Sequence, residues 1–483
     1  MIEKANRRIW GLLVLAAYTI YISYIAYHHE LWRDEVDVWL FVRDTDFNGF
    51  FRYLRNSGHP GLWHLFVLPF AKLQFPNFTF QILHLFLAFS SAYLLLFYSP
   101  FPIWIQFSIL FSYFFIFEYS VIARNYAIGI LFLFSICAFF EKRFEKPFIY
   151  AFLILLLANT NLYCSILASG FALMFIWEVL EKRDFTIRNI SSIAIMGLGG
   201  ILLILQVFPS SETQGSAMRE FKVFNNLGSV ISILYSFTPG ISKLDFRILT
   251  GFILLITLGI LVFTNKKLFF FYLYSLSLLW SFYTFIFING YRHGGFVFLT
   301  FLVTLWIYAS EKKETSFSST NKYFNLRNIL LFFSVISLSQ SIPFGWKETR
   351  KDIRYSFSNA KEMASFIKQN DLDKVENIFS VENADKAKTI LFYLQNQKQF
   401  YFPVIKSFGS HMLWNKVMVD GEIRPSYSHL DHTIEKFRNQ NNIYFISSNP
   451  IQDEHLNLLY QTKDRNEFIA DENFFLYKIN YSK

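Results

Sequence analysis

The sequence predicts a polytopic α-helical membrane protein that ends in a smaller α/β domain outside the membrane. The 483 residues are 53% hydrophobic and 20% aromatic, but only 17% are charged. Apolar segments close to the length that crosses a bilayer, ~20 residues, follow one another up to residue 345. Beyond that point the apolar runs shorten and charges become frequent. The chain therefore divides into a transmembrane domain, 1–345, and a soluble α/β domain, 346–483.

We expect about 11–12 membrane segments in the first domain. The apolar segments are residues 9–28, 60–75, 78–98, 102–118, 125–140, 148–160, 162–180, 189–208, 246–264, 268–288, 294–310 and 328–344. The segment 60–75 reaches only about 24 Å at 1.5 Å per residue, whereas the hydrocarbon core is ~30 Å thick. We therefore predict a partial or re-entrant helix there. The alternative is that one of the basic connectors is assigned to the wrong side.

Basic connectors set the predicted topology. The connectors 141–146, 181–188, 265–267 and 311–327 carry lysine and arginine, as does the N-terminus, and the positive-inside rule places them in the cytoplasm. The opposite face then holds the loop 29–59, the turns 118–125, 159–161 and 289–295, the loop 210–245, and everything after residue 344. The net charge of +9 lies almost entirely before residue 346, which fits cytoplasmic loops and not a nucleic-acid-binding surface.

Shorter patterns predict structure outside the spans. The loop 29–59 has apolar spacings typical of two short amphipathic helices on the membrane surface, 30–46 and 48–56. In the C-terminal domain the helix-like stretches are 358–370, 385–396 and 429–439, and the strand-like ones are 378–381, 399–402, 442–447 and 474–479.

Asp34, Glu35 and Asp37 form a carboxylate cluster in the first loop. Charged groups are costly near hydrocarbon, so such a cluster needs water, partners or a function. Adjacent residues of a helix point to different sides, so Asp34 and Glu35 cannot do the same work. A carboxylate against a low-dielectric wall has a raised pKa, which suits a general base. The alternative is an acidic helix N-terminus that complements the helix dipole and faces water.

Further polar residues lie at turns on the same predicted face. Arg124 follows Glu118, and arginine is suited to binding phosphate, although an internal Glu118–Arg124 ion pair is an alternative. Arg292 and His293 begin a helix, where backbone N–H groups favour an anion; the alternative is an arginine reaching to the interface. His59 can bind a metal or a phosphate oxygen, or can simply precede the proline that starts a helix.

Three motifs in this region resemble the GT-C superfamily of integral-membrane glycosyltransferases. They are Trp-Arg-Asp-Glu at 32–35, Gly-His-Pro-Gly-Leu-Trp at 58–63, and Ile-Ala-Arg-Asn-Tyr at 122–126. Their order is similar to that in bacterial members of the branch that includes protein mannosyltransferases and lipid A aminoarabinose transferases. The resemblance covers about residues 1–345 and implies a GT-C-like fold there.

The resemblance implies a glycosyltransferase of the bacterial inner membrane. Its donor would be a sugar on a polyprenyl phosphate, and its acceptor lipid A, a polysaccharide, another glycolipid or a protein on the outer face. The chain would be multi-pass, with a cytoplasmic N-terminus and an extracytoplasmic C-terminal domain. Besides these substrates we expect membrane lipids as partners and no nucleic acid. The absence of a glycine-rich phosphate-binding loop from the sequence agrees with a lipid-linked donor.

The resemblance also implies roles for the site residues. Asp34 acts as general base on the acceptor, and Glu35 comes second. The residues assigned to the donor phosphate are Arg124, Arg292 and His293. The residues assigned to a divalent metal or to the donor are His59 and Glu118. Many family members carry an acid shortly before the His-Pro step, where this chain has Asn-Ser-Gly at 56–58. A metal there would lack that acidic ligand.

Two other functions fit parts of the pattern. A polysaccharide polymerase or ligase would also use outer-face arginines on a polyprenyl-linked donor, but it does not call for an Asp-Glu pair after the first span. A transporter or flippase predicts ionisable residues near the bilayer midplane and internal repeats. The charges here lie at the ends of spans and no repeat is visible, so transport ranks last.

Overall fold

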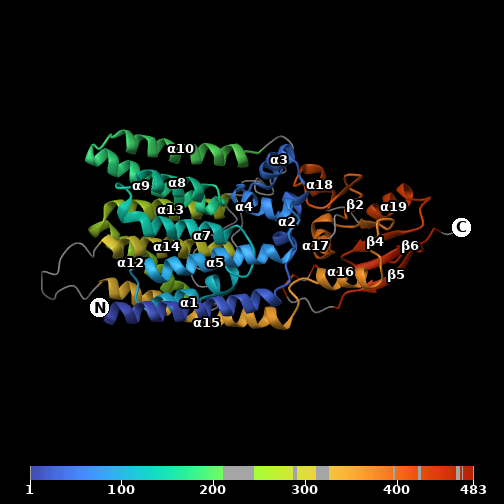
Figure 1. The fold of residues 1–483 in the computed structure, drawn as a ribbon, viewed down its shortest axis with the longest axis horizontal. Coiled ribbons are helices and arrows are strands. Elements are labelled where there is room, and N and C mark those ends of the chain that lie inside the picture. The colour runs from blue at the N-terminus through green and yellow to red at the C-terminus, as the bar shows by residue number, and fades with distance from the viewer. Residues whose placement is uncertain are drawn as a thin grey trace.

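The computed structural model describes residues 2–209, 244–286, 291–311, 326–394, 398–422, 426–463, 468–469 and 471–481. A bundle of long helices forms one end of the molecule, and a six-stranded sheet with its helices forms the other (Figure 1). The N-terminus lies at the far end of the bundle and the C-terminus at the far end of the sheet domain. The prediction of a mainly helical chain with a C-terminal α/β region is confirmed.

Every predicted apolar segment contains a helix. These helices are α1 (Ile2–His28), α4 (Leu62–Lys72), α5 (Phe78–Tyr98), α6 (Ile103–Leu110), α7 (Tyr126–Phe139), α8 (Pro147–Ala158), α9 (Leu162–Lys182), α10 (Ile187–Val207), α12 (Leu244–Thr264), α13 (Lys266–Phe285), α14 (Tyr291–Glu311) and α15 (Leu326–Arg354).

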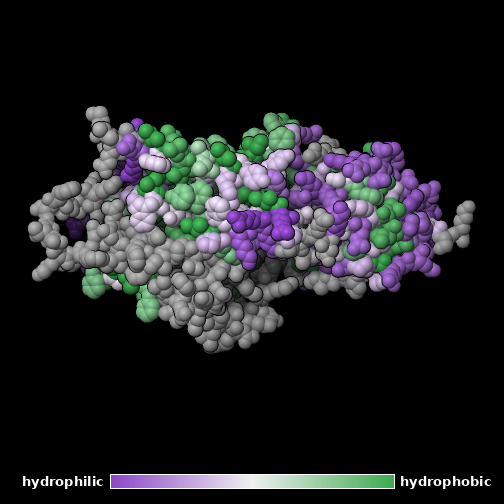
Figure 2. All heavy atoms as spheres, turned by 90° about the horizontal axis from the view of Figure 1, so that it is seen from below, coloured by the Kyte–Doolittle hydropathy of each residue, from purple (hydrophilic) through white to green (hydrophobic). Residues whose placement is uncertain are grey.

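Six helices of the described part are long and apolar enough to cross a membrane, namely α1, α5, α9, α10, α13 and α14. Large apolar side chains such as Ile20 and Leu180 are exposed on the outside of the bundle. On the face seen in Figure 2, hydrophobic surface lies over the bundle, whereas the C-terminal domain is mainly hydrophilic. Such a surface suits hydrocarbon rather than water. The bundle is therefore compatible with a membrane-embedded protein.

The segments 60–75 and 102–118 are among those that differ in length or continuity from a single span. α4 has 11 residues and rises about 16 Å, so it is the partial helix that the sequence predicts. The segment 102–118, predicted as one helix, is broken: α6 ends at Leu110, and a short π-helix, η1 (Phe114–Glu118), follows. The backbone N–H of Tyr113 at this break donates to the hydroxyl of Ser341 on α15. This tertiary hydrogen bond satisfies a group that a continuous helix would satisfy internally.

The first loop contains two helices, α2 (Arg33–Asp44) and α3 (Phe47–Ser57), as predicted. α2 does not lie on the membrane surface with one side in water, however. All of residues 35–42 are buried, because α4 packs against one side of α2 and α17 (Ala384–Leu394) of the C-terminal domain against the other. A surface helix would leave its polar face exposed. The prediction of a membrane-surface position is therefore wrong for α2.

The C-terminal domain contains a mixed sheet. Its strands are β1 (Ile378–Val381), β2 (Phe400–Phe402), β3 (Ser407–Gly409), β4 (Ile443–Ser447), β5 (Leu456–Gln461) and β6 (Phe475–Ile479). They lie in the order β3-β2-β1-β4-β6-β5. The central strand β1 runs parallel to β2 and β4, and the other pairs are antiparallel. Its other helices are α16 (Ala360–Gln369), α18 (Lys416–Gly421) and α19 (Ser426–Lys436).

The predicted strands correspond to β1, β2, β4 and β6, and the predicted helices to α16, α17 and α19. The two strands that the sequence pattern missed, β3 and β5, form the edges of the sheet, where one side of the strand is unpaired and the pattern of burial is weak. α15 runs through the predicted domain boundary at 345/346 as one helix and ends at Arg354.

Candidate functional site

The predicted carboxylate and the two predicted arginines meet where the bundle faces the C-terminal domain. Asp34 lies in the first turn of α2, Arg124 in the turn before α7, and Arg292 in the first turn of α14. Oδ2 of Asp34 is 2.5 Å from Nη1 of Arg124 and 3.7 Å from Nη1 of Arg292. Residues from three distant parts of the chain thus form one charge cluster.

Glu118 joins this cluster through Arg292 and not through Arg124. Its Oε1 is 3.5 Å from Nε of Arg292, and the hydroxyl of Tyr113 donates to its Oε2 at 2.6 Å. The hydroxyl of Tyr119 donates to the backbone carbonyl of Arg292 at 2.6 Å, which holds the start of α14 beside η1. The break after α6 therefore has a role, because it turns η1 so that Glu118 reaches the arginine. The alternative Glu118–Arg124 pair is not among the ion pairs of the described residues.

Asp34 is ionised in this environment. Partial burial by itself would raise the pKa of its carboxyl, but Arg124, Arg292 and Lys388 outweigh burial and lower the pKa to about 2. The expectation of a raised pKa is therefore wrong for the site as it stands. A low-dielectric wall stabilises the neutral acid, but two guanidinium groups within ion-pair distance stabilise the carboxylate more. The side chain keeps 29% of its surface exposed, so it is accessible from outside.

Glu35, the neighbour of Asp34, points the other way and is fully buried. Its Oε1 accepts the backbone N–H of Ala123, next to Arg124. Its Oε2 accepts the backbone N–H of Trp32 at 3.2 Å and lies 3.0 Å from Nε2 of His29. Because the N–H of Trp32 belongs to the N-cap of α2, Glu35 fixes both the start of this helix and the Arg124 turn. Its position assigns it to holding Asp34 and Arg124 in place.

His29 lies between two buried carboxylates. Besides Glu35, its Nδ1 is 3.0 Å from Oδ2 of Asp352, near the end of α15. Burial alone would lower the pKa of His29, but the Asp352 and Glu35 carboxylates hold it well above its usual range. The resulting charged triad joins the residue that follows α1 to the first turn of α2 and to α15.

The His29 triad predicts a loss of stability at alkaline pH. Because the pKa of His29 is higher in the folded state, protonated His29 stabilises the fold fully below about pH 6.5, the pKa of a histidine in the unfolded chain. It is lost as the pH rises through the higher folded pKa, by up to about 1.4 kcal/mol per pH unit. Thermal unfolding of the detergent-solubilised protein between pH 6 and 10 should show this decline, and His29→Gln should flatten it. The control is His28→Gln, and an equal slope in wild type and His29→Gln would contradict the triad.

His59 and His293 both lie near the cluster, because the charges of Arg124 and Asp34 act on both imidazole rings. His59 is exposed just before α4. The ring of His293 stacks on Tyr163 with centroids 5.3 Å apart, and its backbone carbonyl accepts from the hydroxyl of Tyr283.

Among the described residues no three His, Cys, Asp or Glu side chains are grouped to hold a metal ion. A divalent metal held by His59 and Glu118 therefore stays a prediction.

The C-terminal domain contributes Lys388 on α17, which the sequence did not single out. This fully buried lysine lies 2.7 Å from Oδ1 of Asp37 and 2.7 Å from Oδ1 of Asp385. Asp37 also accepts from the hydroxyl of Tyr53 and, at 3.2 Å, from the indole N–H of Trp414. Asp34 and Asp37 are three residues apart on α2 and so share a face. No local pattern marks Lys388, because its partner on α2 is about 350 residues away in the chain.

Trp32 lines the same cluster. The guanidinium of Arg292 lies 5.1 Å from the centre of its ring and that of Arg33 lies 5.5 Å away, within cation–π range. Arg33 also forms ion pairs with Asp385 and Asp471 of the C-terminal domain. The domain is thus attached to α2 by charges on both sides of Asp34.

Comparison with protein-family models and with curated proteins finds no match to the chain.

Proposed function

We propose that the chain is a membrane glycosyltransferase that moves a sugar from a polyprenyl-phosphate donor to an acceptor, with Asp34 as the base. The observation that carries the proposal is the accessible Asp34 carboxylate beside two arginines, Arg124 and Arg292. A glycosyl phosphate needs cations at its leaving group and a base at its acceptor, and this cluster supplies both kinds of group. The sequence resemblance to GT-C enzymes supports the same function. This function would place the transfer site at the outer face of a bacterial inner membrane.

Competition for the arginines connects donor binding to base strength. A donor phosphate would attract the guanidinium groups of Arg124 and Arg292, which now pair with Asp34. As they turn to the phosphate, Asp34 loses the cations that lower the pKa of its carboxyl. The base therefore becomes stronger when the donor is in place. Without a donor, the carboxylate neutralises two buried or half-buried cations.

The chemical step follows from these positions. The acceptor hydroxyl or amine attacks the anomeric carbon while its proton passes to Asp34. The bond between that carbon and the phosphate oxygen breaks, and the polyprenyl phosphate leaves with the electron pair, stabilised by Arg124 and Arg292. Attack from the face opposite the leaving group inverts the anomeric configuration. Glu35 and Glu118 hold the Arg124 turn and the Arg292 side chain.

A polymerase or ligase would use the same cluster with a lipid-linked glycan as acceptor, so it differs in substrate and not in the donor step. Transport is less well supported. The acidic and basic residues of the long described helices lie near their ends, as Arg292 and Glu311 do in α14, and not at the midplane where a transporter binds its cargo.

The direct test incubates the purified protein with a panel of polyprenyl-phosphate sugars and a mixture of lipid, glycan and peptide acceptors. We expect mass spectrometry to detect free polyprenyl phosphate and a glycosylated acceptor with at least one donor. If every donor stays intact in the presence of acceptors while the protein remains folded, the proposal is wrong. Movement of an intact donor across a vesicle membrane without sugar loss would instead indicate a flippase.

Arg292→Ala should weaken donor binding about tenfold to a hundredfold, because a hydrogen bond to a charged group contributes roughly 1.5–3 kcal/mol. Binding of a non-transferable polyprenyl-phosphate analogue measures this effect. The matched control is Arg52→Ala, which removes an exposed arginine of α3. Equal affinity in Arg292→Ala and in the wild type would exclude a phosphate contact.

A further inference from the structure

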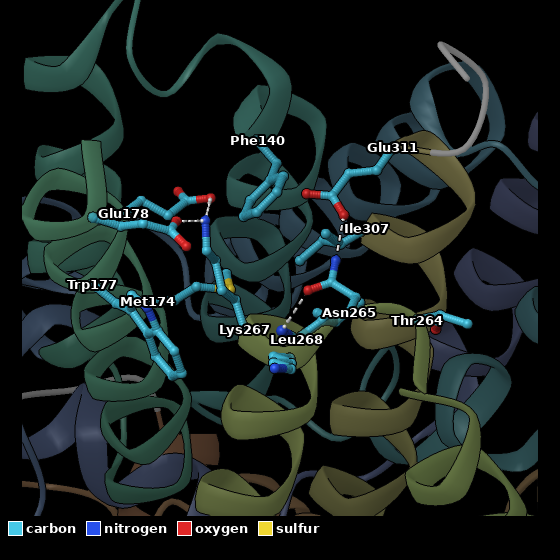
Figure 3. A pocket seen from close by; sticks show the side chains of 12 residues that line it. Phe140, Met174, Trp177, Glu178, Thr264, Asn265, Lys267, Leu268, Ile307 and Glu311 are labelled. Atoms are coloured by element: carbon cyan, nitrogen blue, oxygen red, sulfur yellow. Dashed lines mark hydrogen bonds and ion pairs between the residues drawn. The ribbon is translucent and has the colours of Figure 1, made fainter. Parts of the chain in front are cut away.

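A second cluster of charges lies at the opposite end of the bundle from Asp34. α14 connects the two, because it starts at the Arg292 end and finishes at Glu311, about 30 Å away along the helix axis. At this far end is a cavity of about 310 Å³ between α9, α13 and α14 (Figure 3). Connectors that are well separated in the sequence meet there.

Part of the cluster is a structural support. Arg143 donates from Nε and Nη2 to both carboxylate oxygens of Glu178, at 2.7 Å each, and Glu178 is buried. This bidentate pair attaches the turn after α7 to α9. Since Arg143 already occupies both oxygens of Glu178, the charge available to a ligand comes from the other lining residues.

The exposed lining residues carry both signs of charge. Lys267 forms an ion pair with Glu181, and Asn265 donates to Oε2 of Glu311 at 2.7 Å. The side chains of Glu181, Glu311 and Lys267 are 53%, 33% and 25% exposed, and Lys266 is exposed beside them. Arg143 also lies 3.9 Å from Glu311, and Lys267 lies 3.8 Å from Glu178, so Arg143 and two lysines share three carboxylates. The cavity is therefore neutral overall but offers separate places for a cation and for an anion.

A shallow, open apolar groove adjoins the cavity. Leu173, Ile176, Trp177, Leu180 and Phe270 line it together with Glu181. Trp177 and Glu181 line both spaces, so the groove leads directly to the charged cavity. It runs over the outer side of α9, a helix long and apolar enough to span a membrane. Hydrocarbon is the natural occupant of such a groove, and a tryptophan at its polar end is typical of the membrane interface.

We propose that the cavity and groove together bind one phospholipid with a zwitterionic, primary-amine headgroup, of the phosphatidylethanolamine type, from the leaflet opposite Asp34. The ammonium group contacts Glu181 and Glu311, the phosphate contacts Lys266 and Lys267, and an acyl chain follows the groove. Two carboxylates disfavour a purely anionic headgroup. A primary ammonium can donate hydrogen bonds to both carboxylates, whereas a trimethylated amine has no N–H to donate. The site is separate from the proposed transfer site and does not depend on that function.

The test is native mass spectrometry of the full chain after delipidation and exposure to phosphatidylethanolamine, phosphatidylcholine and phosphatidylglycerol with identical acyl chains. We expect one phosphatidylethanolamine per chain, retained about tenfold more strongly than either competitor, the effect of one charged hydrogen bond. Glu181→Gln should reduce this preference about tenfold, and Glu311→Gln provides a second, independent variant. Glu145→Gln, an exposed carboxylate at the same end but outside the cavity, should change nothing.

Variants of the groove separate the acyl chain from the headgroup. Phe270→Ala should weaken retention of all three lipids equally, whereas Phe263→Ala, an exposed aromatic on α12, should not. Equal or stronger retention of phosphatidylglycerol would overturn the proposal. So would a preference for phosphatidylethanolamine that survives both Glu181→Gln and Glu311→Gln.

Discussion

Asp34→Asn is expected to lower the rate of sugar transfer by about 10²–10⁴-fold, the usual contribution of a general base. Asparagine has nearly the same shape but cannot accept the acceptor's proton. Single-turnover transfer from a lipid-linked donor, with saturating donor, measures the chemical step. Asp44→Asn, which changes an acid at the other end of α2, is the control and should retain wild-type rates.

Donor affinity distinguishes a base from a merely structural acid. In the free protein the Asp34 carboxylate competes with the donor phosphate for Arg124 and Arg292, so its removal should leave donor binding unchanged or make it tighter. If Asp34 only held the arginines in position, donor affinity would fall together with the rate. A near-normal rate in Asp34→Asn would remove Asp34 as the base.

Lys388→Met should have the largest effect on stability, about 3–5 kcal/mol, because removal of one partner leaves a buried charge uncompensated. Lys388 is fully buried between Asp37 and Asp385. Burial by itself would lower the pKa of the lysine, but the two carboxylates raise it above its usual value, so the lysine is charged. Thermal unfolding and the rate at which protease releases the C-terminal domain would report the loss. Lys436→Met, at an exposed position of α19, is the control.

A double variant tests whether the charge pair causes this effect. Asp37→Leu combined with Lys388→Met removes both charges, and an apolar pair should recover part of the lost stability. Additive losses in the double variant would show that packing, and not the unpaired charge, accounts for the single-variant result.

The helices of the bundle could be predicted because their signal is local. A continuous apolar run of about 20 residues can satisfy its backbone only as a helix in hydrocarbon, whatever lies around it. The break at Tyr113 could not be predicted in this way. It depends on Ser341, more than 200 residues away, which accepts the N–H that the interrupted helix leaves free. α2 was likewise recognised as a helix, but its burial depends on α17, which covers it from the C-terminal domain.

The candidate site shows the same division. Residue type and position at predicted turns were enough to select Asp34, Arg124 and Arg292, and the structure brings these three together. They were not enough to assign partners, and Glu118 pairs with Arg292 instead of Arg124. Nor could they indicate the direction of the pKa shift at Asp34, because that depends on the number of cations within a few ångströms.

Composition and periodicity predict a bundle of apolar helices with a charged first loop and an α/β domain, because both depend only on neighbouring residues. The way in which that loop is held depends on tertiary contacts. Glu35 pairs with His29, whose other ring nitrogen contacts Asp352, and Asp37 pairs with Lys388. The His29–Asp352 and Asp37–Lys388 contacts join positions more than 300 residues apart. Burying these charges is favourable only when each meets its opposite, and only the folded arrangement of α2 between the bundle and the C-terminal domain provides those partners.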